Sequence, residues 1–250
     1  MKHLLKGKVA LVTGCDRGIG YAICQKIAQA GGTVYANILE EKSADALLEL
    51  EGTIQEGKVI PVCFDITDKK ASYNCILKIK KEFGKLDVLV NNAGVIHDGL
   101  LEMMNEEALR KTFEVNVFGT FFVTQAAVKL MKRNPDGGSV INVSSIIGLQ
   151  GNVGQSVYGA SKAAIANMTM SLAREYVGQN IRFNAVAPGS IDTEMFYKYD
   201  EETKNDTLKA IGMGRLGKPE EVANVVLFLA SEMSSYITGE IVGVNGGLFR

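Results

Sequence analysis

The sequence predicts an α/β protein built on one doubly wound parallel sheet of about seven strands, with helices on both faces. Short apolar runs rich in β-branched residues alternate along the chain with longer segments of helical period. Most of these runs are apolar at every position, which is typical of strands that are covered on both faces. The alternation occupies residues 1–250 without a shift in composition, so we expect a single domain.

The predicted strands and helices follow one another in a regular order. Seven apolar runs are the candidate strands: 9–14, 33–38, 59–64, 86–92, 139–145, 181–189 and 240–247. Segments of helical period lie between them, among them 20–31, 68–83, 105–133, 158–178 and 219–230. Strand–helix alternation of this kind implies right-handed βαβ units and therefore a parallel sheet.

Composition and charge argue against several classes of partner. The net charge of −1 gives no electrostatic support for binding nucleic acid or an anionic membrane. The four cysteines form no C-x-x-C pair and the chain has two histidines, so we expect no metal site. We expect no membrane span, because no segment is long and apolar enough, and we expect no signal peptide, because the apolar stretch in MKHLLKGKVALVTG is short. We therefore expect a cytoplasmic protein with free thiols.

A glycine-rich loop, TGCDRGIG, follows the first predicted strand. It places Gly14, Gly18 and Gly20 between that strand and the first helix. Backbone amides at a helix N-terminus favour a phosphate, and glycines allow the phosphate to approach closely. The spacing G-x-x-x-G-x-G differs from the standard G-x-G-x-x-G fingerprint, so an ordinary tight turn is the alternative.

Segment 189–217 is a long stretch without strand character, and its middle is polar and charged. It follows the carboxyl end of a predicted strand, which is where open α/β sheets bind ligands. We therefore predict a mobile flap over a binding site. The alternative is a long surface connection.

Tyr158 is the one tyrosine of eight that is followed four residues later by a lysine, Lys162. Positions i and i+4 share a face of a helix, so the phenol and the ammonium are expected side by side. The pair has two interpretations. It is either a solvated helix face or a proton donor whose pKa is lowered by a cation.

Seven motifs occur in one order along nearly the whole chain. They are TGCDRGIG, DIT at Asp65, NNAG at 91–94, EVNVFG with Asn116, NVSS before Tyr158, PGSIDT from Pro188, and VNGG near the C-terminus. On these motifs the chain is identified as a member of the short-chain dehydrogenase/reductase family. The resemblance implies a Rossmann-type fold and hydride transfer between a nicotinamide and a carbonyl or alcohol carbon. A non-catalytic, nucleotide-binding regulatory protein is an alternative, but such a protein would be expected to lack the tyrosine or the lysine.

The resemblance also assigns catalytic residues. Tyr158 matches the acid that protonates the substrate oxygen, and Lys162 matches the lysine that favours the phenolate and holds the nicotinamide ribose. Of Ser144 and Ser145, the family spacing selects Ser145, which would bind the substrate oxygen as charge develops. Asn116 resembles the asparagine that holds a water relay to the lysine. Bringing the pKa of Tyr158 from about 10 to about 7 requires roughly 4 kcal/mol of differential stabilisation.

The same resemblance implies which residues bind the cofactor. The acidic position that favours NAD(H) falls on Ile38, so no carboxylate accepts a bond from the ribose 2′-hydroxyl there. Arg17 offers a planar fork to a 2′-phosphate, although Asp16, Glu40 and Glu41 lie near. We therefore expect NADP(H) rather than NAD(H). The full predicted set is Gly14, Asp16, Arg17, Gly18, Ile19, Gly20, Asn37, Ile38, Asp65, Ile66, Asn92, Ala93, Gly94, Tyr158, Lys162, Pro188, Gly189, Ile191 and Thr193.

The stretch NNAGVIHDGLLEMMNEEAL, with its His97-Asp98 pair, resembles the 3-oxoacyl-[acyl-carrier-protein] reductases of this family. The resemblance implies reduction of a 3-oxoacyl thioester in fatty acid biosynthesis. Gln179 stands where those reductases carry a basic residue for docking the carrier protein, and Lys132 or Arg133 remains for the other basic site. A dehydrogenase or reductase of a sugar, polyol or other small alcohol is therefore the alternative.

Segment 109–133 is apolar on more than one face, through Phe113, Val117, Phe121 and Phe122. A helix with so wide an apolar surface must be covered by more than its own sheet. Family members commonly pair this helix and the tyrosine-bearing helix across a two-fold axis. The resemblance therefore implies a homotetramer.

Overall fold

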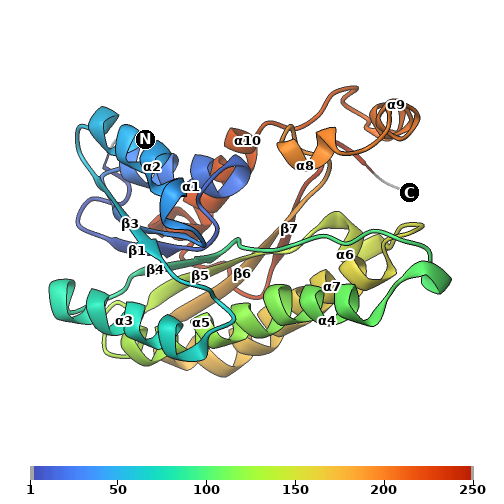
Figure 1. The fold of residues 1–250 in the computed structure, drawn as a ribbon. Coiled ribbons are helices and arrows are strands. Elements are labelled where there is room, and N and C mark those ends of the chain that lie inside the picture. The colour runs from blue at the N-terminus through green and yellow to red at the C-terminus, as the bar shows by residue number, and fades with distance from the viewer. Residues whose placement is uncertain (1–2, 249–250) are drawn as a thin grey trace.

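The computed structural model describes residues 3–248 and contains a seven-stranded parallel sheet with helices on both faces (Figure 1). Each predicted run overlaps one strand, and the parallel sheet confirms the predicted fold class. The strand order is β3-β2-β1-β4-β5-β6-β7. The strands are β1 (Val9–Val12), β2 (Thr33–Ile38), β3 (Lys58–Cys63), β4 (Val88–Asn91), β5 (Gly138–Val143), β6 (Ile181–Pro188) and β7 (Ile241–Val244).

The order of the strands reverses next to β1. The chain runs outward from β1 to β3 and then returns, so that β4 pairs with the free side of β1. Ala10 of β1 is therefore in register with Val34 on one side and with Val88 on the other. In an open sheet such a switch point leaves a crevice between the loops that follow the two strands.

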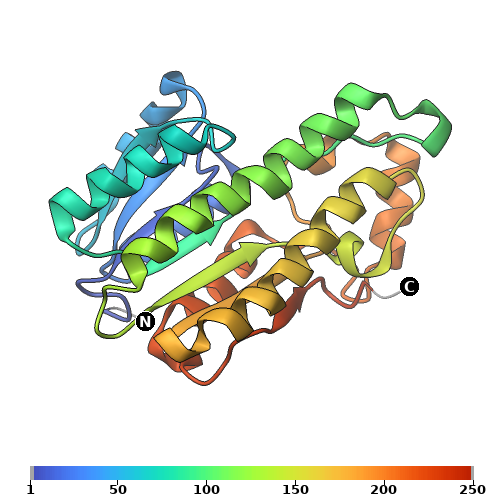
Figure 2. The same ribbon diagram turned by 90° about the horizontal axis from the view of Figure 1, so that it is seen from below.

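Two layers of helices cover the sheet (Figures 1 and 2). One layer holds α1 (Gly18–Gln29), α2 (Ala44–Thr53) and α10 (Pro219–Ala230). The other holds α3 (Lys69–Phe83), α4 (Glu106–Phe113), α5 (Thr120–Met131) and α7 (Ser156–Tyr176), which Figure 2 shows from below. The short helices η1 (Glu41–Ser43), η2 (Leu101–Met103), α6 (Ile146–Gln150), η4 (Val177–Gln179) and η5 (Glu232–Ser234) complete the connections. Two apolar cores result, one on each side of the sheet.

Side-chain caps and glycines set several helix ends. The Asp68 carboxylate accepts hydrogen bonds from the amides of Lys70 and Ala71 at the start of α3. The same helix ends at Gly84, whose φ of 73° is left-handed and favours glycine. Asn105 caps α4 through the amide of Ala108. These signals explain why the predicted limits of the helix at 68–83 agree with the structure to within one residue.

The predicted helix 105–133 is interrupted by a π-helical turn. This turn, η3 (Glu114–Gly119), separates α4 from α5 and contains Asn116. At its end, Gly119 packs against Ile66, because a Cβ built on Gly119 would lie 2.8 Å from the Ile66 side chain. Single π-helical turns occur frequently at functional sites, and this one carries a predicted catalytic residue.

Segment 189–217 contains two helices that the sequence did not predict. They are α8 (Glu194–Tyr197) and α9 (Glu201–Ala210), which lie beyond the carboxyl ends of the strands in Figure 1. The base of the segment is held by backbone hydrogen bonds from Met213 to Gly246 and from Gly217 to Ser190. No residue of α9 is buried, so this helix adds little to the core.

Two further features of residues 3–248 bear on function. None of their helices combines the length and the apolar character that crossing a membrane requires. Nor do their His, Cys, Asp and Glu side chains form a group of three or more that could hold a metal ion.

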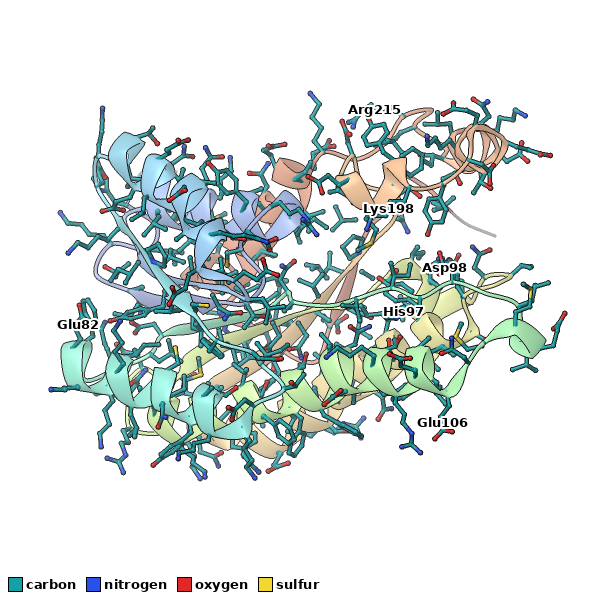
Figure 3. The ribbon with its side chains drawn as sticks, in the orientation of Figure 1. Glu82, His97, Asp98, Glu106, Lys198 and Arg215 are labelled. Carbon is teal, nitrogen blue, oxygen red and sulfur yellow. The ribbon has the colours of Figure 1, made fainter. Side chains whose placement is uncertain are left out.

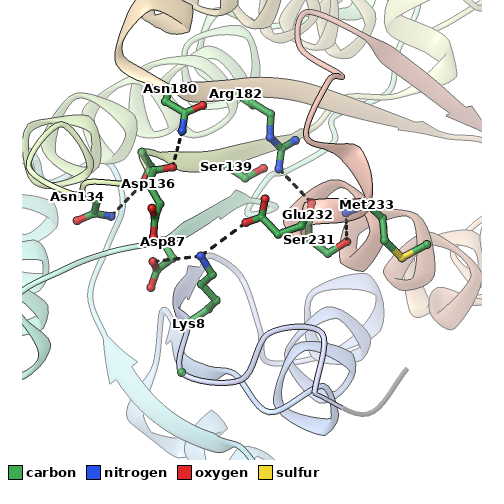
Figure 4. Close-up of polar contacts among 12 residues, drawn as sticks. Lys8, Asp87, Asn134, Asp136, Ser139, Asn180, Arg182, Ser231, Glu232 and Met233 are labelled. Carbon is green, nitrogen blue, oxygen red and sulfur yellow. Dashed lines mark hydrogen bonds and ion pairs between the residues drawn. The ribbon is translucent and has the colours of Figure 1, made fainter.

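Polar side chains join the strands at the amino-terminal edge of the sheet (Figure 4). The buried carboxylate of Asp87 accepts a hydrogen bond of 2.8 Å from the amide of Val9 and forms an ion pair of 3.0 Å with Lys85. Lys8 connects the same carboxylate to Glu232 across the edge, at 3.9 and 3.7 Å. These contacts lie at the end of the sheet opposite to the crevice.

Arg182 of β6 binds the carboxyl end of α10 at this edge. Its guanidinium donates to the carbonyl oxygens of Leu229 at 3.0 Å and Ser231 at 3.3 Å, and to Ser234 Oγ at 3.0 Å. Burial lowers the pKa of Arg182. A cation that binds the terminal carbonyls of a helix is favoured both by hydrogen bonding and by the helix dipole.

We therefore expect Arg182→Met to lower the free energy of unfolding by about 2–3 kcal/mol, because buried carbonyls lose a charged donor. Urea unfolding at fixed protein concentration measures the change. Arg215→Met is the control, because Arg215 binds Glu221 at 2.8 Å with half of its side chain exposed. An exposed pair is worth about 0–1 kcal/mol. Equal losses in the two variants would contradict the role assigned to Arg182.

Candidate active site

A cavity of about 1020 Å³ opens at the carboxyl ends of the strands and is bordered by α8 and α9. Most of the predicted site residues line it, although they come from distant parts of the chain. They are Gly14, Asp16, Arg17, Gly18, Ile19, Gly20, Asn37, Asp65, Ile66, Asn92, Ala93, Gly94, Ser145, Tyr158, Lys162, Pro188, Gly189, Ile191 and Thr193. Ile38 and Asn116 are the two predicted residues that do not line the cavity wall.

The glycine loop is compact because glycines stand where its two ends approach each other most closely. Gly14 has a φ of 68°, and a Cβ on Gly20 would collide with the carbonyl oxygen of Gly14. Two asparagines fix the loop. Asn92 Nδ2 donates to the carbonyls of Thr13 and Gly14 at 3.0 and 2.8 Å, and Asn37 Oδ1 accepts from the amide of Gly14 at 3.3 Å. The loop is therefore held in place by β2 and β4, the two neighbours of β1.

The amino terminus of α1 faces this cavity and fits a phosphate group. The helix begins at Gly18 without a side-chain cap and without an acidic residue in its first turn. Its free amides and its dipole therefore favour an anion. Arg17 lies at the N-cap, with its guanidinium 3.8 Å from Asp16 and 3.5 Å from Glu194 of α8. The residues present thus suit the pyrophosphate of a dinucleotide.

The end of β2 differs from the sequence prediction. Ile38 is 1% exposed and packs in the core, so its side chain does not face the cavity. Leu39, the next residue, is 66% exposed and lines the cavity. Successive side chains of a strand point to opposite faces, and a buried Ile38 therefore directs Leu39 outward. The alternation of side chains along β2 is therefore the sequence signal that would have placed Leu39, and not Ile38, in the cavity.

Three other predicted positions shape the walls. Asp65 Oδ1 accepts from the amide and the hydroxyl of Thr67, both at 2.8 Å, and so fixes the turn after β3. The methyl group of Thr193 lies 3.2 Å from the position of a Cβ on Gly18, which brings the start of α8 against the glycine loop. The backbone amide of Gly189 donates to Val244, which ties the end of β6 to β7.

Tyr158 and Ser145 meet at the end of β5. Tyr158 lies in the first turn of α7, and Ser145 is the N-cap of α6. Burial raises the pKa of Tyr158 to about 12, although a hydrogen bond with Ser145 acts to lower it. Ser144 is directed elsewhere, since its hydroxyl donates to the carbonyl of Lys162 at 2.8 Å. The geometry therefore favours Ser145 over Ser144 as the partner of Tyr158.

Lys162 is buried one turn further along α7. Its ammonium donates to the carbonyl of Val143 at 2.8 Å and lies 5.9 Å from the centre of the Tyr158 ring. Burial lowers the pKa of Lys162 to about 8. Lys162 therefore does not bring the pKa of Tyr158 below its ordinary value in the protein alone. An oxidised nicotinamide would add a positive charge that favours the phenolate when it is bound.

Asn116 supports this arrangement from behind the cavity wall. Its side-chain amide donates to the carbonyl of Val95 at 2.9 Å and to Ser161 Oγ at 3.0 Å, and its Oδ1 accepts from the amide of Val95 at 2.8 Å. A Cβ on Gly94 would lie 3.1 Å from Asn116 Oδ1 and 3.3 Å from Lys162 Nζ. Glycine at this position thus lets the chain after β4 pass between the two side chains.

Near Tyr158 the cavity wall carries further polar side chains that the motifs did not reveal. Asp98 and Gln155 lie on this wall, and Tyr199 reaches them from segment 189–217. Figure 3 shows Asp98 on one rim and Lys198, the neighbour of Tyr199, on the other. Gln155 precedes Tyr158 by three residues, so a helical-spacing argument could have placed it on the same face. His97 turns away from this wall, with Nδ1 2.9 Å from Thr112 Oγ1.

Comparison with known proteins gives a consistent result. A family profile described as enoyl-(acyl carrier protein) reductase matches residues 14–249. The chain is 46% identical to the 3-oxoacyl-[acyl-carrier-protein] reductase of Thermotoga maritima, over 98% of each chain. It is 42% identical to the enzyme of that name from Aquifex aeolicus over 100% of each chain, and 38% identical to that of Escherichia coli over 98% of each.

The buried lysine predicts a dependence of stability on pH. An unfolded lysine titrates near about 10.4, so between about pH 8 and that value the unfolded state binds more protons than the folded state. The free energy of unfolding therefore rises with pH in this window. Between about pH 7 and about pH 9.5 we expect the wild type to gain roughly 2 kcal/mol relative to Lys162→Met.

Urea unfolding at a series of pH values measures this difference. Lys209→Met is the control, because the Lys209 side chain is 76% exposed. Wild-type and Lys162→Met stabilities that run parallel across the window would show that folding does not lower the pKa of Lys162.

Proposed function

The chain belongs to the short-chain dehydrogenase/reductase family of oxidoreductases, and from this premise we propose that it reduces a 3-oxoacyl thioester of acyl carrier protein with NADPH. One observation carries the proposal. Tyr158 and Ser145 meet on the wall of the same cavity into which the glycine loop and the start of α1 project. Relatives that match the chain over nearly its full length carry the name of this activity.

Four residues of the chain have separate roles in the proposed reduction. The nicotinamide, when bound, supplies the hydride to the carbonyl carbon. Tyr158 donates the proton that the carbonyl oxygen then requires, and its raised pKa keeps the phenol protonated until that step. Ser145 donates a hydrogen bond to the same oxygen as negative charge develops. Lys162 holds a positive charge behind the phenol, and Asn116 fixes the chain that packs against Lys162.

The preference for NADPH rests on the end of β2. Asn37 uses its side chain on the glycine loop, Ile38 is in the core, and Leu39 is apolar. A carboxylate that binds the ribose 2′-hydroxyl usually selects NAD, and none of these three residues offers one. Arg17, with a 64% exposed side chain, is the donor available to a 2′-phosphate.

The proposal extends to the carrier and to the assembly. The relatives' printed name includes an acyl carrier protein, and Lys132 and Arg133 are exposed cations that a carrier could bind, whereas Gln179 is exposed and uncharged. Exposed apolar side chains on α5 and α7, such as Phe121 and Met170, support a homotetramer that covers them. We place this tetramer in the cytoplasm.

The first test concerns the acid. Tyr158→Phe is expected to bind NADPH as the wild type does and to lose about 10²–10⁴ in kcat, because it lacks the donated proton. Nicotinamide fluorescence gives the binding constant, and NADPH absorbance gives turnover of acetoacetyl-CoA. Tyr73→Phe, on the exposed face of α3, is the control. A Tyr158→Phe variant with wild-type kcat would rule out Tyr158 as the acid.

The second test concerns the cofactor. Titration with NADPH and with NADH is expected to show at least about tenfold tighter binding of NADPH, a difference of about 1.4 kcal/mol. Arg17→Ala should remove this difference, whereas Arg110→Ala, in an exposed pair with Glu106, should leave it unchanged. Tighter binding of NADH by the wild type would contradict the assignment. Binding without oxidation by the thioester would favour a sugar or polyol substrate.

A further inference from the structure

Three loops that are far apart in the sequence meet at one hydrogen-bonded network. The Tyr199 hydroxyl, between α8 and α9, donates to Asp98 Oδ2 at 2.8 Å. Gln155 Nε2 donates to Asp98 Oδ1 at 3.1 Å and to the Tyr199 oxygen at 3.2 Å. Gln155 Oε1 in turn accepts from Asn152 at 2.8 Å. The network therefore joins segment 189–217 to the opposite wall of the cavity.

That wall is the one that carries the proposed acid. Gln155 is the N-cap of α7, and its carbonyl accepts a hydrogen bond of 2.7 Å from the amide of Gly159. It is 8% exposed, so its side chain is held in one position inside the cavity. Tyr158 lies one helical turn further on. The loop of Asp98 is fixed to the same place by a backbone bond of 2.7 Å from Gly99 to Gly154.

Other contacts hold the tip of segment 189–217 weakly. The ion pair of Arg17 with Glu194 spans 3.5 Å between side chains that are 64% and 70% exposed. Exposed pairs of this kind contribute about 0–1 kcal/mol. No residue of α9 is buried, although Leu208 packs against the cluster of Ile146, Ile211 and Leu248. Phe196 of α8 is 7% exposed and stacks edge-on against Tyr199. The bond from the Tyr199 hydroxyl to Asp98 is therefore the polar contact that joins the tip of the segment to the opposite wall.

We propose that Tyr199 is a positioning residue that holds segment 189–217 closed over the substrate through Asp98 and Gln155. The inference rests on the proposed function for the identity of the substrate, an acyl thioester. Closure places the reacting carbonyl in a cavity from which water is excluded. The Asp98 carboxylate also adds to burial in raising the pKa of Tyr158, which keeps the acid protonated while the segment is closed.

The proposal makes a specific kinetic prediction. If substrate binds the closed state, the apparent dissociation constant equals the intrinsic one divided by the closed fraction. Loss of the Tyr199 hydroxyl lowers that fraction but leaves chemistry in the closed complex unchanged. Tyr199→Phe should therefore raise KM for acetoacetyl-CoA about tenfold, with kcat within about twofold of the wild type, at saturating NADPH.

The same segment supplies a matched control. The Tyr197 hydroxyl donates to Asp192 at 2.8 Å, within the segment and away from the opposite wall. Tyr197→Phe removes the same atom from a neighbouring position and should leave KM and kcat unchanged. Equal increases of KM in the two variants, or a fall of kcat with unchanged KM in Tyr199→Phe, would overturn the proposal.

A second measurement tests closure without turnover. Hydrogen–deuterium exchange should be faster over α9 in Tyr199→Phe than in the wild type and in Tyr197→Phe, with exchange in the core strands unchanged. This readout separates the two proposals, because it stands even if the wild type does not reduce the thioester. Identical exchange over α9 in all three proteins would show that Tyr199 does not hold the segment closed.

Discussion

The parallel pairing of β1 with β4 is the constraint from which the site follows. It brings the chain that leaves β1 beside the chain that leaves β4, so that Asn92 reaches the carbonyls of the glycine loop. It also places β5 next in the sheet, and with β5 come Ser145 and the packing surface of α7. At the amino-terminal edge of the sheet, the Asp87 carboxylate binds the amide of Val9 and the Arg182 guanidinium binds the carbonyl of Leu229. These contacts fix the strands at the end opposite to the site. The predicted site residues gather at the carboxyl end of the sheet because the reversal of strand order next to β1 opens the crevice there.

Burial rather than pairing dominates the electrostatics of the site. Tyr158 and Lys162 are neighbours, yet each has its pKa moved towards its neutral form. Such a pair is ready to respond to a charge brought by a ligand, because the protein has removed the water that would screen that charge. The exposed alternative, a solvated pair on a helix face, is excluded by the burial of Lys162 at 5% exposure.

Local patterns predicted the strands, the main helices and most of the cavity wall, because these depend on apolar periodicity and on short motifs. Ile38 was misplaced because the family position was transferred without following the alternation of β2. The π-helical turn was not predicted. Its hydrogen bonds join residues five apart where those of the flanking α-helices join residues four apart, and the apolar pattern of the sequence does not mark this difference. Contacts such as Tyr199 with Asp98, which are 101 residues apart, depend on tertiary structure and left no local signal.

The π-helical turn has a consequence for the surface of the long helix in which it lies. One residue of an α-helix corresponds to about 100° of rotation, so an inserted residue turns everything after it to a new azimuth. Residues after Asn116 therefore have a different azimuth from the one that an unbroken α-helix would give them. Among these residues are Phe118 and Phe121, which are exposed. A helical wheel drawn through 105–133 with a single period assigns them to the wrong direction, so the face that the second half of the segment presents follows from the π-helical turn and not from the sequence period alone.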